Sequence, residues 1–189
     1  MSGRIGGGWN IGAVTRREGG GAQKGAAQFE VAEKTKYPVK EASDVVALPG
    51  GRFLIVGDAA DKVGLVGADG KLTKLKLPGL PNGNSQLEGV AYDPVRHHLL
   101  VSREEKGEIL RYEWNAEKNA PPKLEKTFEL KKGDGPKNKG VEGLAYLSGD
   151  FSPTGTPQLL AAREGNPREL MLLGDGGGGK PIKIKLEDQ

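Results

Sequence analysis

The sequence contains no cysteine among its 189 residues. Disulfide bonds and thiolate metal sites are therefore excluded, and so is catalysis by a thiol. The cellular compartment is left open, because an exported protein does not need disulfides.

Aromatic residues are also scarce, at 5%, and charge of neither sign dominates. The 28 Lys and Arg residues nearly balance the 25 Asp and Glu residues, which gives a net charge of +3. No segment combines dense basic residues with interleaved aromatic residues. This pattern argues against nucleic acid as the main partner.

Long apolar runs are missing as well. No run approaches the roughly 20 residues that a membrane-spanning helix requires. The first residues lack the apolar core of a signal peptide. The sequence therefore predicts no membrane span and leaves the localisation unknown.

Glycine, by contrast, is abundant, with 31 residues. Much of the excess lies near the N-terminus, in runs that bury too little surface to offset their backbone entropy. We predict a flexible, glycine-rich arm over residues 1–27 and a folded domain over residues 28–189.

Within the folded domain, short apolar segments alternate with turn signals such as Pro49-Gly50-Gly51 and Asp69-Gly70. A first strand is predicted within residues 29–37, and the next such segments are 45–48, 53–56, 63–66 and 72–77. No stretch shows the sustained 3.6-residue period of a helix. Short strands separated by turns at this spacing are typical of a sandwich, a barrel or a propeller.

The strand pattern is repeated three times. The units begin at Glu41-Ala42-Ser43, Glu88-Gly89-Val90 and Glu142-Gly143-Leu144, and each start is followed by three more apolar segments. A period of about 40–50 residues with four strands per unit is typical of a β-propeller blade. We therefore predict an all-β fold of three four-stranded blades, which is half of a six-bladed ring.

A half-ring leaves the faces of its two terminal blades uncovered, and uncovered blades invite association. The sequence accordingly predicts a homo-oligomer, with a homodimer closing the ring. The alternative is that the chain is part of a longer propeller.

The glutamates Glu41, Glu88 and Glu142 start the innermost strands, which line the channel of a propeller. A hard cation such as Ca²⁺ takes six to eight oxygen ligands, which carboxylates and backbone carbonyls supply. We predict these three residues as metal ligands, with calcium as the candidate cofactor. The alternative is that each glutamate accepts backbone N–H bonds from the neighbouring blade and so latches the blades together.

A further acidic residue follows each second strand. Because adjacent strand residues point to opposite faces, only one residue of the Arg163-Glu164 pair faces the channel. The alternative for these charged residues is an ordinary ion pair. The predicted ligand or channel residues are Asp58, Glu104, Arg163 and Glu164.

Other catalytic signatures are weak. His97 and His98 are neighbours on a strand and diverge, so they do not bind one metal together. The sequence has no Gly-x-Ser-x-Gly elbow, so it gives little support to a serine esterase, and it predicts no catalytic residue.

The segment Asn-Lys-Gly-Val-Glu-Gly-Leu-Ala-Tyr at 138–146, followed by Arg163-Glu164 and Pro167, resembles the SdiA-regulated proteins and the related phytase-like esterase domains. The resemblance covers roughly residues 37–175. It implies a six-bladed propeller, usually exported, with calcium in some members.

Together these observations predict a propeller module that binds a ligand or a partner, with calcium at the channel. One alternative is a metal-assisted hydrolase of carboxylic or phosphate esters. Another is a structural half-propeller that dimerises. Whether the protein is an enzyme stays open at this point.

Overall fold

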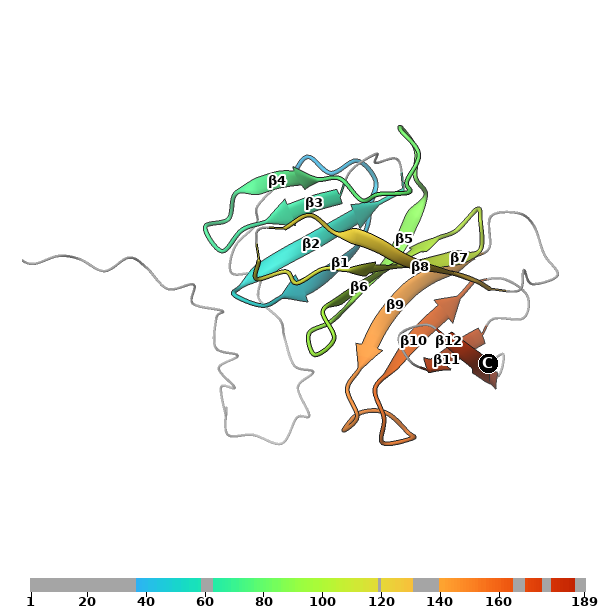
Figure 1. The fold of residues 1–189 in the computed structure, drawn as a ribbon. Coiled ribbons are helices and arrows are strands. Elements are labelled where there is room, and N and C mark those ends of the chain that lie inside the picture. Colours follow the sequence, from blue (N-terminus) through green and yellow to red (C-terminus); the bar gives the residue numbers. More distant parts are fainter. Residues whose placement is uncertain are drawn as a thin grey trace, which may run out of the picture. The chain divides into compact units, whose positions relative to one another are not determined.

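The computed structural model describes residues 37–58, 63–118, 120–130, 140–164 and 169–174, and the backbone of 178–185. In these ranges every regular element is a β-strand, and the strands form three four-stranded antiparallel sheets (Figure 1). The predicted all-β fold with three propeller blades is confirmed. The predicted arm over residues 1–27 and, apart from Tyr37, the strand predicted within residues 29–37 lie outside the described residues.

Each sheet is built from four strands that are consecutive in the sequence, as a propeller blade requires. Blade 1 contains β1 (Ala42–Leu48), β2 (Arg52–Gly57), β3 (Val63–Val66) and β4 (Leu72–Leu75). Blade 2 contains β5 (Leu87–Asp93), β6 (His98–Arg103), β7 (Glu108–Glu113) and β8 (Lys123–Glu129). Blade 3 contains β9 (Val141–Leu147), β10 (Gln158–Arg163), β11 (Glu169–Gly174) and β12 (Gly178–Lys185).

The turns between strands carry the chemistry that their tight geometry needs. In the β3–β4 hairpin, Gly70 has a φ of 75°, which is the left-handed region where glycine has no steric penalty. The N–H of Gly70 donates to the carbonyl of Gly67 at 2.9 Å, and Asp69 accepts from the N–H of Lys71 at 3.1 Å. These local hydrogen bonds stabilise the tight turn that reverses the chain direction between β3 and β4.

The hydrophobic core lies between successive blades. In blade 1, Val45 and Phe53 lie on the same face, which we call the N-side face. In the other blades, the N-side face is the one with the residues equivalent to these two, and the opposite face of each blade is its C-side face. The C-side face of blade 1 and the N-side face of blade 2 form one cluster of buried residues, including Leu54, Val56, Val90, Leu99 and Val101. Each fully buried side chain of this kind contributes about 1.5–3 kcal/mol.

A second cluster joins blade 2 to blade 3 in the same way. It places Ala91, Leu100 and Ile109 of blade 2 against Leu159 and Ala161 of blade 3. The first strands β1, β5 and β9 contact one another in that order. The ends of these three strands are therefore close together, and this arrangement positions the candidate site.

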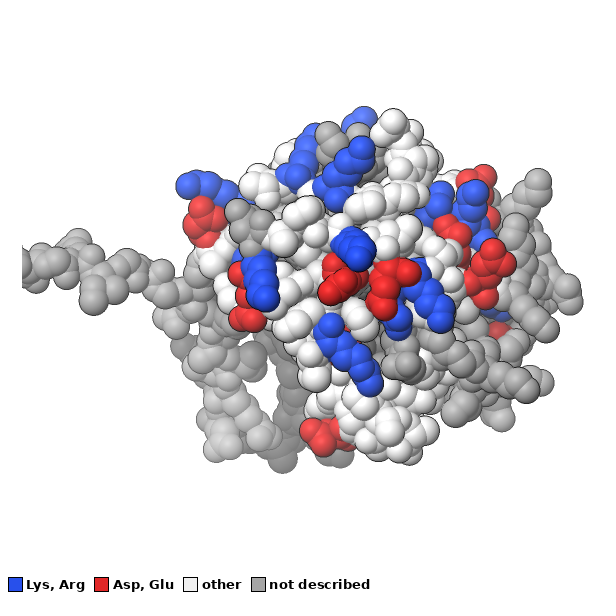
Figure 2. Space-filling view, viewed as in Figure 1, with Lys and Arg blue, Asp and Glu red and all other residues white. Residues whose placement is uncertain are grey.

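The surface charges agree with the balanced composition. Figure 2 shows Lys/Arg and Asp/Glu side chains mixed together in the middle of the face it displays. Among the described residues there is no helix long and apolar enough to cross a membrane.

Candidate acidic site at the start of the inner strands

The six predicted acidic residues lie at the same edge of their blades. The first and second strands of each blade run antiparallel, so the residue that follows the second strand lies beside the start of the first. Glu88 and Glu142 belong to β5 and β9, and Glu41 immediately precedes β1. The residues that follow the second strands β2, β6 and β10 are Asp58, Glu104 and Glu164.

A repeated backbone hydrogen bond builds this edge. The N–H of Asp58 donates to the carbonyl of Glu41 at 3.0 Å, and the N–H of Glu104 donates to the carbonyl of Gln86 at 3.1 Å. In blade 3 the N–H of Glu164 donates to Gly140 at 3.3 Å. The acidic residues after the second strands therefore occupy equivalent positions.

These hydrogen bonds show that the sequence alignment of Glu41 with Glu88 and Glu142 was wrong. They make Glu41 equivalent to Gln86 and Gly140, not to Glu88 and Glu142. The strand register agrees, because Ala42, Leu87 and Val141 pair with Gly57, Arg103 and Arg163 at the ends of the second strands. Ser43 is thus the counterpart of Glu88 and Glu142 in blade 1. The pairing of each first strand with its second strand shifts register near the start of the first strand. The spacing of the glutamates in the sequence does not reveal this shift.

The carboxylates at this edge interact electrostatically. Partial burial raises the pKa of Glu142 to about 7, with further contributions from the negative charges of Glu104, Glu88 and Glu164 and from a hydrogen bond with the side chain of Glu104. Desolvation together with like charge disfavours ionisation. Glu142 therefore titrates close to neutral pH.

The pKa of Glu88 is raised as well. Burial is the largest cause that raises its pKa, and the charges of Asp58, Glu104 and Glu41 add to it, whereas a hydrogen bond from Ser43 opposes it. The acidic groups of all three blades thus influence one another.

The chemistry of this edge fits a cation better than an anion. Oε1 of Glu142 and Oδ1 of Asp58 are buried and have no hydrogen-bond partner within the described part of the chain. Carboxylate oxygens are the ligands that hard cations prefer. In this conformation, however, no three acidic or histidine side chains of the described residues are arranged to hold one metal ion. Metal binding by Glu41, Glu88 and Glu142 stays a prediction.

The predicted arginine of this edge is engaged in an ion pair. Arg163 lies 3.4 Å from Glu169 on the neighbouring strand, and both side chains are buried. Blade 2 has the same pair at equivalent positions, with Arg103 at 2.7 Å from Glu108. The two arginines thus share a structural role in joining the second strand to the third.

The latches between blades are made by residues that sequence reasoning missed. The Asp44 carboxylate of blade 1 accepts from the N–H of Val90 in blade 2 at 2.8 Å. The buried hydroxyl of Ser102 in blade 2 donates to the carbonyl of Val141 in blade 3 at 2.9 Å and accepts from the N–H of Gly89 at 2.7 Å. No sequence pattern marked either residue, because their partners belong to other blades or strands.

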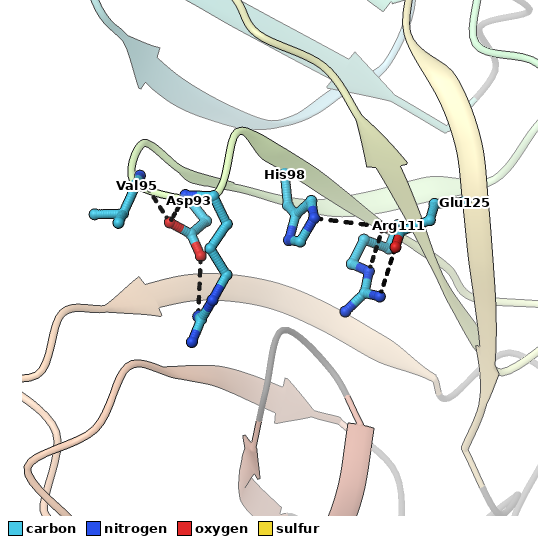
Figure 3. Close-up of polar contacts among 6 residues, drawn as sticks. Asp93, Val95, His98, Arg111 and Glu125 are labelled. Carbon is cyan, nitrogen blue, oxygen red and sulfur yellow. Dashed lines mark hydrogen bonds and ion pairs between the residues drawn. The ribbon is translucent and has the colours of Figure 1, made fainter.

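His98 begins β6, at the end of that strand opposite to Glu104. Figure 3 shows it beside Arg111 and Glu125. Its Nε2 is 3.4 Å from Glu125, which also binds Arg111 at 2.9 and 3.1 Å. Burial, followed by the charge of Arg111, lowers the pKa of His98. Nearby, Asp93 accepts from the N–H groups of Val95 and Arg96 and holds a tight turn.

The fold places the chain among the β-propeller proteins. No family model matches the chain, and no curated protein is significantly similar to it in sequence. Solved β-propeller structures nevertheless share its fold.

Three such structures are representative. A luciferin-regenerating enzyme has a TM-score of 0.56 at 15% identity, with 77% of this chain and 46% of that chain covered. Regucalcin, a calcium-binding protein from Agrobacterium tumefaciens, has a TM-score of 0.54 at 16% identity, with 77% and 45% covered. A PQQ-bound aldose sugar dehydrogenase from Streptomyces coelicolor has a TM-score of 0.52 at 19% identity, with 82% and 48% covered. The chain therefore spans less than half the length of these propellers.

Proposed function

We propose that this protein is a β-propeller binding module that takes up a divalent cation, with calcium as the first candidate, at the acidic edge of its inner strands. The observation that carries the proposal is the pKa of Glu142, which burial raises to about 7. The negative charges of Glu104 and Glu88 in blade 2 and of Glu164 in blade 3 raise it further. A cation removes this repulsion, so the folded protein gains stability when it binds. One similar structure, regucalcin, is described as calcium-binding, which supports the choice of ion.

Glu142 and Glu104 are the ligands that the proposal needs first. They are joined by a hydrogen bond, and Glu142 has a buried oxygen without a partner among the described residues. Glu88 contributes a third carboxylate from the neighbouring inner strand. Small side-chain rotations or bridging waters would complete the coordination, because calcium tolerates flexible geometry and water ligands.

Melting curves with calcium test this proposal. Millimolar calcium should raise the melting temperature of the full chain, and a chelator should reverse the increase. The increase should be larger at about pH 8 than at about pH 6, because the cation competes with the proton on Glu142. Glu142→Gln should abolish the increase, whereas Glu125→Gln, at the other end of blade 2, should retain it. An unchanged melting temperature of the native chain with calcium at about pH 8 would contradict the proposal.

The raised pKa of Glu142 also favours a second function, that of a hydrolase. A carboxylate that titrates near 7 suits general acid–base catalysis. In a metal-assisted hydrolase of carboxylic or phosphate esters, Glu142 would take a proton from water as its oxygen attacks the ester. The bound cation would supply Lewis-acid activation of that water. The resemblance to phytase-like esterase domains supports this alternative.

Turnover separates the two functions. A hydrolase should release p-nitrophenol from p-nitrophenyl acetate or phosphate in the presence of calcium, and should lose this activity with a chelator or with Glu142→Gln. A module that only binds should show the calcium-dependent melting shift without turnover.

A further inference from the structure

The N-side face of blade 1 is open at Val45 and Phe53, which match positions that are buried in the other blades, while Val39 lies close to Gly64 on the same face. Val45 is 57% exposed, whereas Val90 at the same position of blade 2 is 2% exposed. Phe53 is 43% exposed, whereas its counterpart Leu99 is fully buried. Large apolar groups are thus presented where a neighbouring blade would cover them.

The N-side face of blade 3 is buried, like that of blade 2. Leu144 and Leu159, the counterparts of Val45 and Phe53, are 9% and 1% exposed because the C-side face of blade 2 covers them. In both contacts within the chain, the N-side face of one blade meets the C-side face of the blade before it. The N-side face of blade 1 therefore fits the C-side face of another propeller blade.

The chain itself carries a C-side face that is partly open for this role, although Leu172 on that face is 4% exposed. In blade 3, Ala145 is exposed and Leu160 is half-buried. Their counterparts Ala91 and Leu100 in blade 2 are both 1% exposed, because blade 3 covers them. The two ends of the described three-blade unit are therefore complementary in type.

We propose that a second copy of this chain completes the ring, with the N-side face of blade 1 of each copy packed on the C-side face of blade 3 of the other. A twofold axis repeats the contact and leaves no terminal blade uncovered. The chain aligns with 46% and 45% of the length of two solved propeller chains, as a unit of about half a ring would. An exposed apolar patch of this kind on a protein surface typically marks such an interface.

The proposed interface lacks the polar links that join the blades within the chain. Gly143 and Ala162 of blade 3 occupy the positions of Asp44 and Ser102. Neither residue has a side chain that can hydrogen-bond, so apolar contact must hold the copies together. Raising the salt concentration should therefore not dissociate the dimer, since screening acts on charges.

Light scattering coupled to size-exclusion chromatography tests the proposal on the full chain. The experiment is done in a chelator, so that its outcome does not depend on the cation site. The expected mass is twice the 20.0 kDa of one chain. Phe53→Asp should reduce the mass to one chain without changing the circular dichroism spectrum. Phe151→Asp is the matched control, because Phe151 is 80% exposed in the β9–β10 loop, and it should leave the dimer intact.

Mixing variants tests the pairing of the two faces. Phe53→Asp damages one face and Ala145→Asp the other, so each variant alone should be a monomer. A mixture of the two retains one intact interface per pair and should show dimers again. A monomeric native chain would overturn the proposal, whether the face is covered by residues before Tyr37 or by blades of a longer protein. A dimeric Phe53→Asp variant, or a mixture that stays monomeric, would also overturn it.

Discussion

The carboxylate of Asp44 in blade 1 accepts a hydrogen bond of 2.8 Å from the backbone N–H of Val90 in blade 2. Its other oxygen accepts from the N–H of Val45 at 2.7 Å. Asp44 therefore organises the start of its own strand and ties it to the next blade. Charged acceptors make the stronger class of protein hydrogen bond.

Asp44→Ala should lower the free energy of unfolding by about 1–3 kcal/mol, because it leaves the N–H of Val90 without its acceptor. Asp44→Asn keeps an acceptor oxygen and should lose less. Urea denaturation measures the difference, with Asp150→Ala in the exposed β9–β10 loop as the control. An Asp44→Ala variant as stable as the control would show that this latch contributes nothing.

The hydroxyl of Ser102 forms the corresponding link between blades 2 and 3. It is fully buried, donates to Val141 and accepts from Gly89. Ser102→Ala should destabilise the chain by about 1–3 kcal/mol, because two buried backbone groups lose their partner. The half-buried loop residue Ser148 is the control for Ser→Ala replacement. Equal unfolding midpoints for the two variants would contradict this role.

Gly89 should tolerate no side chain. A Cβ at this position would lie 2.9 Å from the backbone nitrogen of Leu144 in blade 3 and 2.9 Å from the Oγ of Ser102. Gly89→Ala should therefore separate blades 2 and 3 and lower the melting temperature by several degrees, at about 1–3 kcal/mol of overpacking. Gly143→Ala is the matched control, because Gly143 is the counterpart of Gly89 in β9 and the nearest atom to its Cβ would be the Cβ of Ala162 at 3.9 Å, an ordinary contact. A Gly89→Ala variant that melts with the native chain would refute the close approach.

The raised pKa of Glu142 predicts a pH dependence of stability. The folded state holds the proton up to about pH 7, whereas the unfolded chain releases it near 4.5. The folded state binds more protons in this window, so stability should fall as pH rises from about 4.5 to about 7. Glu142→Gln should flatten this part of the curve and raise the melting temperature above pH 7. A profile that is identical in the variant would contradict the shift.

The ion pair between Arg163 and Glu169 should matter more than an exposed pair. Both of its side chains are buried, whereas those of Asp69 and Lys71 are 56% and 84% exposed. Glu169→Ala should cost about 3–5 kcal/mol, because it removes a carboxylate that faces a buried guanidinium. Asp69→Ala should lower stability much less, because solvent screens an exposed ion pair. Similar losses in the two variants, measured by urea denaturation, would disprove the contrast.

Much of the fold was predictable because its determinants are local. The alternation in segments such as Phe53–Val56 marks strands, and Asp69-Gly70 marks a hairpin, without knowledge of any distant residue. The repeat of these segments then predicted three blades. The sequence also placed acidic residues near the starts of first strands and after second strands, and antiparallel pairing brings these two positions to the same edge of a blade.

The sequence by itself therefore determined the strands and the blades. Only the tertiary structure decided the strand register, which makes Ser43, and not Glu41, the residue of blade 1 equivalent to Glu88 and Glu142. The reason is that an irregularity in a strand changes which side chain faces the channel. The tertiary structure also decided that Asp44 and Ser102 link the blades. These bonds join residues 46 and 39 positions apart, and no local pattern encodes a contact over that distance.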